Sequence, residues 1–134
     1  MTTLVDTNVL LDIATEDPEW CEWSASCLEQ AADRGGVAIN PIIYAELSVH
    51  YGAIEDLEHA LSRHSFERLD LPWDAAFVAG KAYLRYRRRN GAKRSPLPDF
   101  YIGAHAAVIG LALLTRDARR YREYFPKLRL IAPD

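Results

Sequence analysis

Short apolar runs alternate with stretches of helical character along the whole sequence. The runs that we expect to form strands are residues 2–5, 37–39, 66–69, 111–114 and 128–131. Each is bounded by proline, glycine or polar residues, and helix signals fill the intervals between them. A regular order of strand and helix favours a parallel sheet with helices on both faces. The sequence therefore predicts a three-layer α/β/α fold around a central parallel sheet of four to five strands.

Helix boundaries are marked by capping residues, prolines and glycines. Asp17-Pro18 and Asn40-Pro41 each join a capping side chain to a proline at the first helical position. The stretch 74–89 is expected to be a helix that ends at Asn90-Gly91. One of its faces gathers Phe77, Gly80 and Leu84. A basic, proline-containing loop should connect it to a helix that begins at Asp99.

The size and composition of the chain favour one domain. At 134 residues, of which 49% are hydrophobic, the chain is long enough to build one ordinary core. No apolar run reaches the ~20 residues that cross a bilayer, and the N-terminus lacks the basic and apolar regions of a signal peptide. We therefore expect a single domain over residues 1–134 and a cytoplasmic location.

Charge is distributed unevenly along the chain. The net charge of -3 and the pI of 5.8 argue by themselves against nucleic-acid binding, because such domains are usually basic. However, residues 1–80 carry 15 acidic and 3 basic residues, whereas residues 81–134 carry 4 acidic and 13 basic ones. The second part could therefore hold a phosphate backbone, although a solvated helix face is the simpler interpretation of such a run. The RNA-binding candidates before Asp99 are Arg87, Arg88, Arg89, Lys93 and Arg94, and a second basic cluster around Asp117 contains Arg116, Arg119, Arg120 and Arg122.

Four acidic residues stand where the predicted fold would bring carboxylates together. Asp6 and Asp117 follow predicted strands, and Asp99 stands at a helix start. Glu46 lies in a helix between apolar neighbours. Taken singly, each aspartate is better explained as a helix cap, and the glutamate is explained equally well as a surface residue. Ligands of parallel sheets bind outside the carboxyl ends of the strands, so neighbouring first and fourth strands would make these acids converge.

Such a set of carboxylates suits a hard divalent cation. Oxygen-only sites favour Mg²⁺ or Mn²⁺, and a cation would relieve the repulsion between the acids. The two cysteines and four histidines show no zinc-binding spacing. Water bound by such a cation is acidic enough to act as the nucleophile in a hydrolysis. Candidates for positioning these groups or contacting substrate are Asn8, Thr115 and Arg116, with local turn capping as the alternative for the first two.

Four segments resemble, in order, the motifs of the PIN-domain family. They are Leu4-Val5-Asp6-Thr7-Asn8-Val9-Leu10-Leu11-Asp12, Tyr44-Ala45-Glu46-Leu47, Leu97-Pro98-Asp99-Phe100-Tyr101-Ile102-Gly103-Ala104 and Leu114-Thr115-Arg116-Asp117. The resemblance implies a nuclease whose catalytic metal ligands are Asp6, Glu46, Asp99 and Asp117. A chain made of this domain alone resembles the VapC ribonuclease toxins. That narrower resemblance implies an RNA substrate and a VapB-type antitoxin, and we also expect a homodimer.

Two other functions fit parts of the sequence. A response-regulator receiver has a similar order of elements, with Asp70 as the phosphorylated residue and Thr115 as the hydroxyl after the fourth strand. Against it, Asp6 is followed by Thr7 rather than by a second acid, and Lys127 precedes the last strand instead of following it. The second alternative is a PIN-like module that binds RNA without cutting it. The complete set of acids argues against that module.

Overall fold

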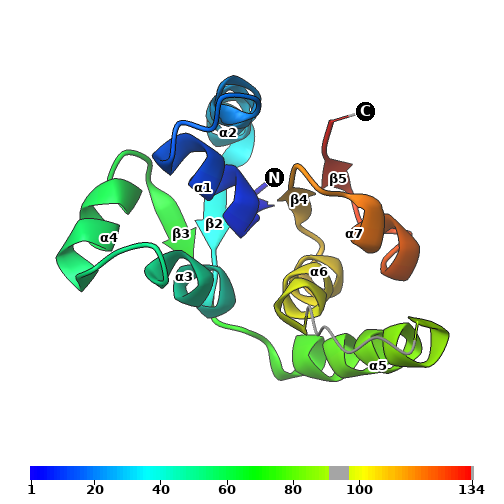
Figure 1. Ribbon diagram of the computed structural model, residues 1–134. Helices are drawn as coiled ribbons and strands as arrows, with labels where there is room; N and C mark the ends of the chain where they lie inside the picture. Colours follow the sequence, from blue (N-terminus) through cyan, green and yellow to red (C-terminus); the bar gives the residue numbers. More distant parts are fainter. Residues whose placement is uncertain (91–96, 134) are drawn as a thin grey trace.

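A five-stranded parallel sheet with helices on both faces forms the centre of the protein (Figure 1). The computed structural model describes residues 1–90 and 97–133. The strands are β1 (Thr3–Val5), β2 (Val37–Ile39), β3 (Phe66–Arg68), β4 (Ala112–Leu114) and β5 (Leu130–Ile131). They are arranged in the order β3-β2-β1-β4-β5, and each pair of neighbours is parallel. The predicted three-layer α/β fold with a parallel sheet is confirmed.

The helices of the described residues follow the predicted order, with shifted starts. They are α1 (Thr7–Ala14), α2 (Cys21–Gly35), α3 (Pro41–Ser48), α4 (Ile54–Leu61), α5 (Trp73–Asn90), α6 (Leu97–Ile109) and α7 (Arg119–Tyr124). The prediction that Asp17 caps α2 was wrong, because Asp17 accepts hydrogen bonds from the backbone of Glu19 and Trp20 and closes a separate turn before the helix. Asp99 lies inside the first turn of α6 and not before it. None of the described helices is both long and apolar enough to cross a membrane.

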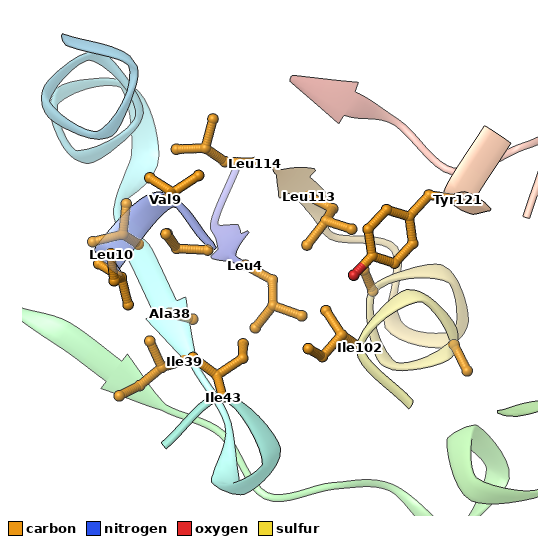
Figure 2. Close-up of a cluster of buried hydrophobic side chains, with 14 of the residues drawn as sticks. Leu4, Val9, Leu10, Ala38, Ile39, Ile43, Ile102, Leu113, Leu114 and Tyr121 are labelled. Carbon is orange, nitrogen blue, oxygen red and sulfur yellow. The ribbon is translucent and has the colours of Figure 1, made fainter. Parts of the chain in front are cut away.

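The core is built on the two faces of the central strands. The strands β1, β2 and β4 are buried along their whole length, as expected for strands covered on both faces. Figure 2 shows Leu4 of β1 and Leu113 of β4 pointing toward Ile102 of α6. These three side chains are completely buried, and burial of each contributes about 1.5–3 kcal/mol. Val9 of α1 and Leu114 of β4 lie together on the other face (Figure 2).

Helix α5 buries small residues and exposes large ones. The helix predicted over 74–89 is confirmed, and its buried positions include Ala75, Ala79 and Ala82, which allow close contact with α6. The face that carries Phe77 and Leu84 points to solvent instead: Phe77 is 67% exposed and Leu84 is 41% exposed. The loop predicted after α5, with Lys93 and Arg94, lies outside the described residues.

The strand order rules out the receiver alternative. In a receiver the third strand is the direct neighbour of the first, as in the order 2-1-3-4-5. Here β2 lies between β1 and β3, and β3 is an edge strand. Asp70 is exposed at the end of that edge strand, separated from Asp6 by the width of β2. The two acids therefore cannot form the phosphorylation site of a receiver.

Candidate active site

The strand order reverses between β1 and β4, and the acidic site lies at this point. The two strands pair in parallel with Val5 opposite Leu114. The residues that follow them meet at the carboxyl edge, where the Thr115 hydroxyl donates a hydrogen bond of 2.8 Å to Oδ2 of Asp6. Crevices outside the carboxyl ends of strands at such a reversal are where open α/β sheets bind ligands.

Asp6 is a helix cap and the most buried acid of the site. It is 4% exposed, and its Oδ1 accepts a hydrogen bond of 2.8 Å from the backbone N–H of Thr7 at the start of α1. Its Oδ2 accepts hydrogen bonds from the hydroxyls of Thr115 and Tyr121. Burial, followed by the charge of Asp99, raises the pKa of Asp6 from its ordinary value of 3.8 to about 7. The protein therefore holds a carboxyl group whose charged form is disfavoured unless a cation compensates it.

The other three predicted acids surround Asp99, which lies in the first turn of α6. Burial raises the pKa of Asp99, the charges of Glu46 and Asp117 raise it further, and Arg120 acts in the opposite direction. Asp99 in turn contributes to the raised pKa of Asp6. The structure therefore brings three of the predicted acids, Asp6, Glu46 and Asp117, from three separate segments of the chain, within electrostatic reach of Asp99.

Glu46 and Asp117 are held by threonines. Oε1 of Glu46, on α3, accepts a hydrogen bond of 2.6 Å from the Thr7 hydroxyl. Asp117 is exposed, and its backbone N–H donates to the Thr115 hydroxyl at 3.1 Å. Thr7 is the first residue of α1, directly after Asp6, and Thr115 directly follows β4. The hydroxyls of these two threonines therefore contact three of the four acidic segments.

The chemistry of these donors fits a hard divalent cation. All of them are carboxylate oxygens, and burial followed by neighbouring negative charge raises the pKa of two of them, Asp6 and Asp99. Among the described residues, no three acidic, histidine or cysteine side chains already form a group that could hold a metal. Three of the acids are engaged by protein partners: Asp6 by Thr7, Thr115 and Tyr121, Glu46 by Thr7, and Asp99 by Arg120. A cation would therefore compete with these partners for the same oxygens.

Helix α7 brings two residues to the acids that the sequence did not assign to them. The Tyr121 hydroxyl donates to Asp6 at 2.9 Å, and burial together with the charge of Asp6 holds the pKa of Tyr121 well above its ordinary value. Nη1 of Arg120 lies 3.0 Å from Oδ2 of Asp99. Sequence reasoning placed Arg120 only in a basic cluster and missed Tyr121, because a tyrosine in a short helix is usually a core residue.

Gly103 of α6 allows close packing of α7 against α6. A side chain at that position would lie 2.6 Å from the ring of Phe125 and 3.0 Å from the ring of Tyr121. The absence of a Cβ atom therefore sets the distance between α6, which carries Asp99, and the segment that carries Tyr121.

Hydrogen bonds of Asn8 connect the first turn of α1 to the segment that follows β4. The Asn8 amide donates to the Thr115 hydroxyl at 3.2 Å, and its oxygen accepts from the Arg116 N–H at 3.2 Å. The amide nitrogen of Asn8 also lies 3.4 Å from Oδ2 of Asp6. Both residues contact Asp6, and Thr115 also makes the local contact of a turn cap with the Asp117 N–H, so both sequence interpretations remain predictions.

The Arg116 side chain runs along α1 and contacts none of the four acids directly. Its Nε lies 2.8 Å from Oδ2 of Asp12, a buried carboxylate that also accepts a hydrogen bond from Ser24. Its guanidinium lies over the Trp20 ring, 5.8 Å from the ring centroid. Arg116 is therefore anchored on α1 and α2 beside the site.

The sequence from residue 3 to residue 125 matches the family model of the PIN domain. The chain belongs to the PIN domain family. Proteins of this family are nucleases and generally use divalent metal ions. A comparison with curated proteins finds no match.

Solved structures of toxin–antitoxin complexes share the fold of this PIN domain. VapBC2 from Rickettsia felis, bound to a DNA fragment from its promoter, is 21% identical over 100% of both chains with a TM-score of 0.73. A toxin–antitoxin complex from Klebsiella pneumoniae is 26% identical over 98% of each chain with a TM-score of 0.67. FitAcB from Neisseria gonorrhoeae is 21% identical over 96% of each chain, also with a TM-score of 0.67. These alignments cover between 96% and 100% of the present chain.

The basic residues predicted to bind RNA lie on the last turns of α5 in this PIN domain. Arg89 pairs with Glu123 of α7, and Arg87 packs on the ring of Tyr83. Arg88 is exposed. Lys93 and Arg94 lie outside the described residues. Arg89 therefore contacts α7, whereas Arg87 and Arg88 line a hollow on the outer side of α5.

Tyrosines of α5 near the basic residues belong to an aromatic cluster. Tyr83 and Tyr86 of α5 pack on Phe100, with ring centroids 5.9 and 5.4 Å apart, and Tyr124 joins them. Tyr101 is half-buried against the core. These contacts place the tyrosines in or against the core.

Proposed function

We propose that this protein is a metal-dependent endoribonuclease of one domain, the toxin of a VapBC-type toxin–antitoxin pair, acting in the cytoplasm. The observation that carries the proposal is the convergence of Asp6, Glu46, Asp99 and Asp117 at the strand reversal, with the pKa of Asp6 raised to about 7. Membership in a nuclease family and the likeness to VapBC complexes support it.

Mg²⁺ or Mn²⁺ held by these acids would neutralise charge on the phosphate and lower the pKa of water. Asp6 and Asp99 are the principal ligands in this proposal, and Glu46 and Asp117 hold the same ion, a second ion or the water. Thr115 and Tyr121 keep Oδ2 of Asp6 in place by hydrogen bonds. Water forms a new bond to phosphorus, the bond from phosphorus to O3′ breaks, and O3′ takes up a proton. The products are a 5′-phosphate and a 3′-hydroxyl.

The substrate would be held through its backbone by the basic second part of the chain. Among the described residues, Arg88, Arg119 and Arg122 are exposed. Contacts of this kind give affinity that falls with salt and carry no sequence information. We therefore expect RNA binding to weaken steeply with ionic strength, with sequence preference determined elsewhere. Arg87, Arg89, Lys93 and Arg94 belong to the same proposed surface.

The proposed partner is a VapB-type antitoxin. The structural neighbours include VapBC and FitAcB complexes, in which toxin and antitoxin are bound. A basic segment of the antitoxin would find complementary charge at the four acids. Such a segment would inhibit the enzyme because it occupies the carboxylates that hold the metal.

We further propose that the protein forms a homodimer through the outer face of α5, defined here by Trp73, Phe77, Gly80 and Leu84. Trp73 is 89% exposed, which is unusual for a tryptophan in an isolated chain. Gly80 has open space around it, and beside it a surface hollow of about 610 Å³ extends to Leu84 and Arg88. The face thus carries bulky rings at one end and a hollow at the other.

A second copy of the chain complements this face when the two helices run antiparallel. The rings at the start of one α5 then meet the hollow and Leu84 near the end of the other. Asp74 at the first turn likewise meets the basic last turns, where Arg87 and Arg88 are exposed. A two-fold axis repeats the contact between rings and hollow and the contact between Asp74 and the arginines, so each copy uses the same surface.

The oligomeric state tests the dimer directly. Sedimentation of the wild-type protein should show a dimer, and Phe77→Asp should shift it to the monomer. Val49→Asp is the matched control, because Val49 is also an apolar residue, 81% exposed, but lies at the end of α3 and not on α5. A monomeric wild type, or a dimer that survives Phe77→Asp unchanged, would refute this surface.

RNA cleavage tests the proposed activity. Purified cellular RNA is incubated with Mg²⁺ or Mn²⁺ and, separately, with chelator. We expect metal-dependent cleavage by the wild type, loss of cleavage in Asp6→Asn and in Asp99→Asn, and retention in Asp70→Asn. The last variant is the control, since Asp70 is an exposed acid at the same edge of the sheet but outside the site. Folded protein that neither binds metal nor cleaves RNA would overturn the proposal.

A further inference from the structure

The ion pair between Asp99 and Arg120 lies inside the acidic site. The two side chains are similarly exposed, 36% for Asp99 and 35% for Arg120, and the distance from Nη1 to Oδ2 is 3.0 Å. Among the described residues, Arg120 is the only cation that makes an ion pair with one of the four acids. The positive charge that a metal ion would supply beside Asp99 is thus supplied by the chain itself.

Asp99 needs such a partner because the other acids surround it. Glu46 and Asp117 act on it as like charges, and it acts in the same way on Asp6. The pKa of Asp99 stays raised even with Arg120 beside it. A single guanidinium at the rim therefore offsets only part of the negative charge, and a divalent ion would offset more.

A second contact gives Arg120 a position to keep when it leaves Asp99. Its guanidinium lies over the Tyr86 ring of α5, 5.3 Å from the centroid, which is the range of a cation–π interaction. One face of the group is thus supported by the ring, and about a third of the side chain remains open to solvent. A guanidinium in this setting can exchange one oxyanion for another without losing its support.

We propose that Arg120 is the counter-ion of Asp99 in the metal-free enzyme and becomes a phosphate-binding residue once a divalent ion has taken Asp99. The inference rests on the proposed nuclease function. Arg120 and the metal compete for one carboxylate, so metal binding frees the guanidinium. A substrate phosphate next to the site provides the oxygens that replace Asp99, and an arginine suits that geometry.

Metal affinity gives the first test. Mn²⁺ binding to the metal-free protein is measured by titration calorimetry for the wild type, Arg120→Gln, Arg120→Lys and Arg119→Gln. We expect Arg120→Gln to bind Mn²⁺ about three- to ten-fold more tightly, because the competing ion pair is gone. Arg120→Lys should stay near the wild type. Arg119→Gln removes the same charge one residue away, where Arg119 is exposed and has no ion pair among the described residues, so it controls for long-range attraction.

RNA affinity gives the second test, in a form that does not depend on cleavage. Binding of a short phosphorothioate RNA is followed by fluorescence anisotropy with Mn²⁺ and with chelator. With Mn²⁺, Arg120→Gln should bind several-fold more weakly than the wild type. With chelator the two should bind alike, because Arg120 is then held by Asp99.

The outcomes separate this inference from the proposed function. Equal Mn²⁺ affinity in the wild type, Arg120→Gln and Arg119→Gln would overturn the competition between Arg120 and the metal. A loss of RNA affinity in Arg120→Gln that is the same with and without Mn²⁺ would overturn the exchange of partners. Absence of Mn²⁺ binding in every variant would overturn the proposed nuclease, and this inference with it.

Discussion

Replacing Asp6 by asparagine is expected to stabilise the metal-free protein above neutral pH. The folded protein raises the pKa of Asp6 from 3.8 to about 7, mainly because the side chain is buried. The folded state therefore keeps the proton that the unfolded chain releases. The stability linked to this proton is fully present below about pH 3.8 and is lost as the pH rises through about 7. Above pH 7 the folded protein carries the whole cost of a buried charge.

The size of this cost follows from the two pKa values. The interval between 3.8 and about 7 corresponds to about 4 kcal/mol, at ~1.4 kcal/mol per pH unit, and this is an upper figure. Asparagine keeps Oδ1 for the Thr7 N–H, so the cap is preserved. Its amide meets the hydroxyls of Thr115 and Tyr121, which can accept, but also the Asn8 amide, which cannot. Subtracting about 1–2 kcal/mol for that mismatch leaves a gain of about 2 kcal/mol.

Urea unfolding with chelator present measures this gain. The free energy of unfolding of Asp6→Asn minus that of the wild type should be near zero or negative at about pH 5 and should reach about +2 kcal/mol at about pH 8. Asp12→Asn is the matched control, since Asp12 is equally buried but ion-paired with Arg116, and its replacement should destabilise at both pH values. A difference for Asp6→Asn that does not change with pH would refute the argument that its charge is uncompensated.

Three further outcomes are expected. In the wild type, millimolar Mn²⁺ should raise the melting temperature at about pH 8 and progressively less below about pH 7, because the proton that Asp6 takes up competes with the metal; a shift of equal size at about pH 5 would contradict this. Tyr121→Phe should cost about 1–2 kcal/mol in urea unfolding and weaken Mn²⁺ binding in calorimetry, since Asp6 loses the bond at 2.9 Å; unchanged metal affinity would show that Tyr121 does not position Asp6. Gly103→Ala should destabilise the fold by about 1–3 kcal/mol, because its Cβ would meet the Phe125 ring at 2.6 Å, and an unchanged unfolding midpoint would show that the ring yields freely.

The parts of the fold that sequence patterns predicted are those with strong local signals. The central strands are short apolar runs, and their positions at 37–39 and 111–114 agree with β2 and β4 within a residue. Asn40-Pro41 begins α3 as predicted, with the Asn40 side chain accepting from the backbone of Ile43. Capping and burial act within a few residues of the signal, so the sequence alone is enough to locate them.

The features that the sequence did not predict depend on contacts between distant segments of the chain. The stripe of Phe77 and Leu84 has the period of a helix, but the period does not say which face is covered, and α6 covers the alanine face. Asp6 and Asp99 were identified because each also follows a strand or opens a helix. Tyr121 bonds with Asp6 across 115 positions of sequence, and only the packing of α7 on Gly103 creates that contact.

In the proposed function, the metal, Arg120 and the antitoxin all bind the same negatively charged site. Four carboxylates at one edge of the sheet leave negative charge that neither the fold nor its hydrogen bonds remove, as the raised pKa values of Asp6 and Asp99 show. Any cation that reaches the site is therefore stabilised there, whether it is Mg²⁺, the guanidinium of Arg120 or a basic side chain of a VapB-type partner. Because these cations use the same oxygens, binding of the partner and binding of the metal must oppose each other by equal factors. An antitoxin built on this principle would inhibit most strongly when the metal is scarce, and excess Mg²⁺ would weaken it.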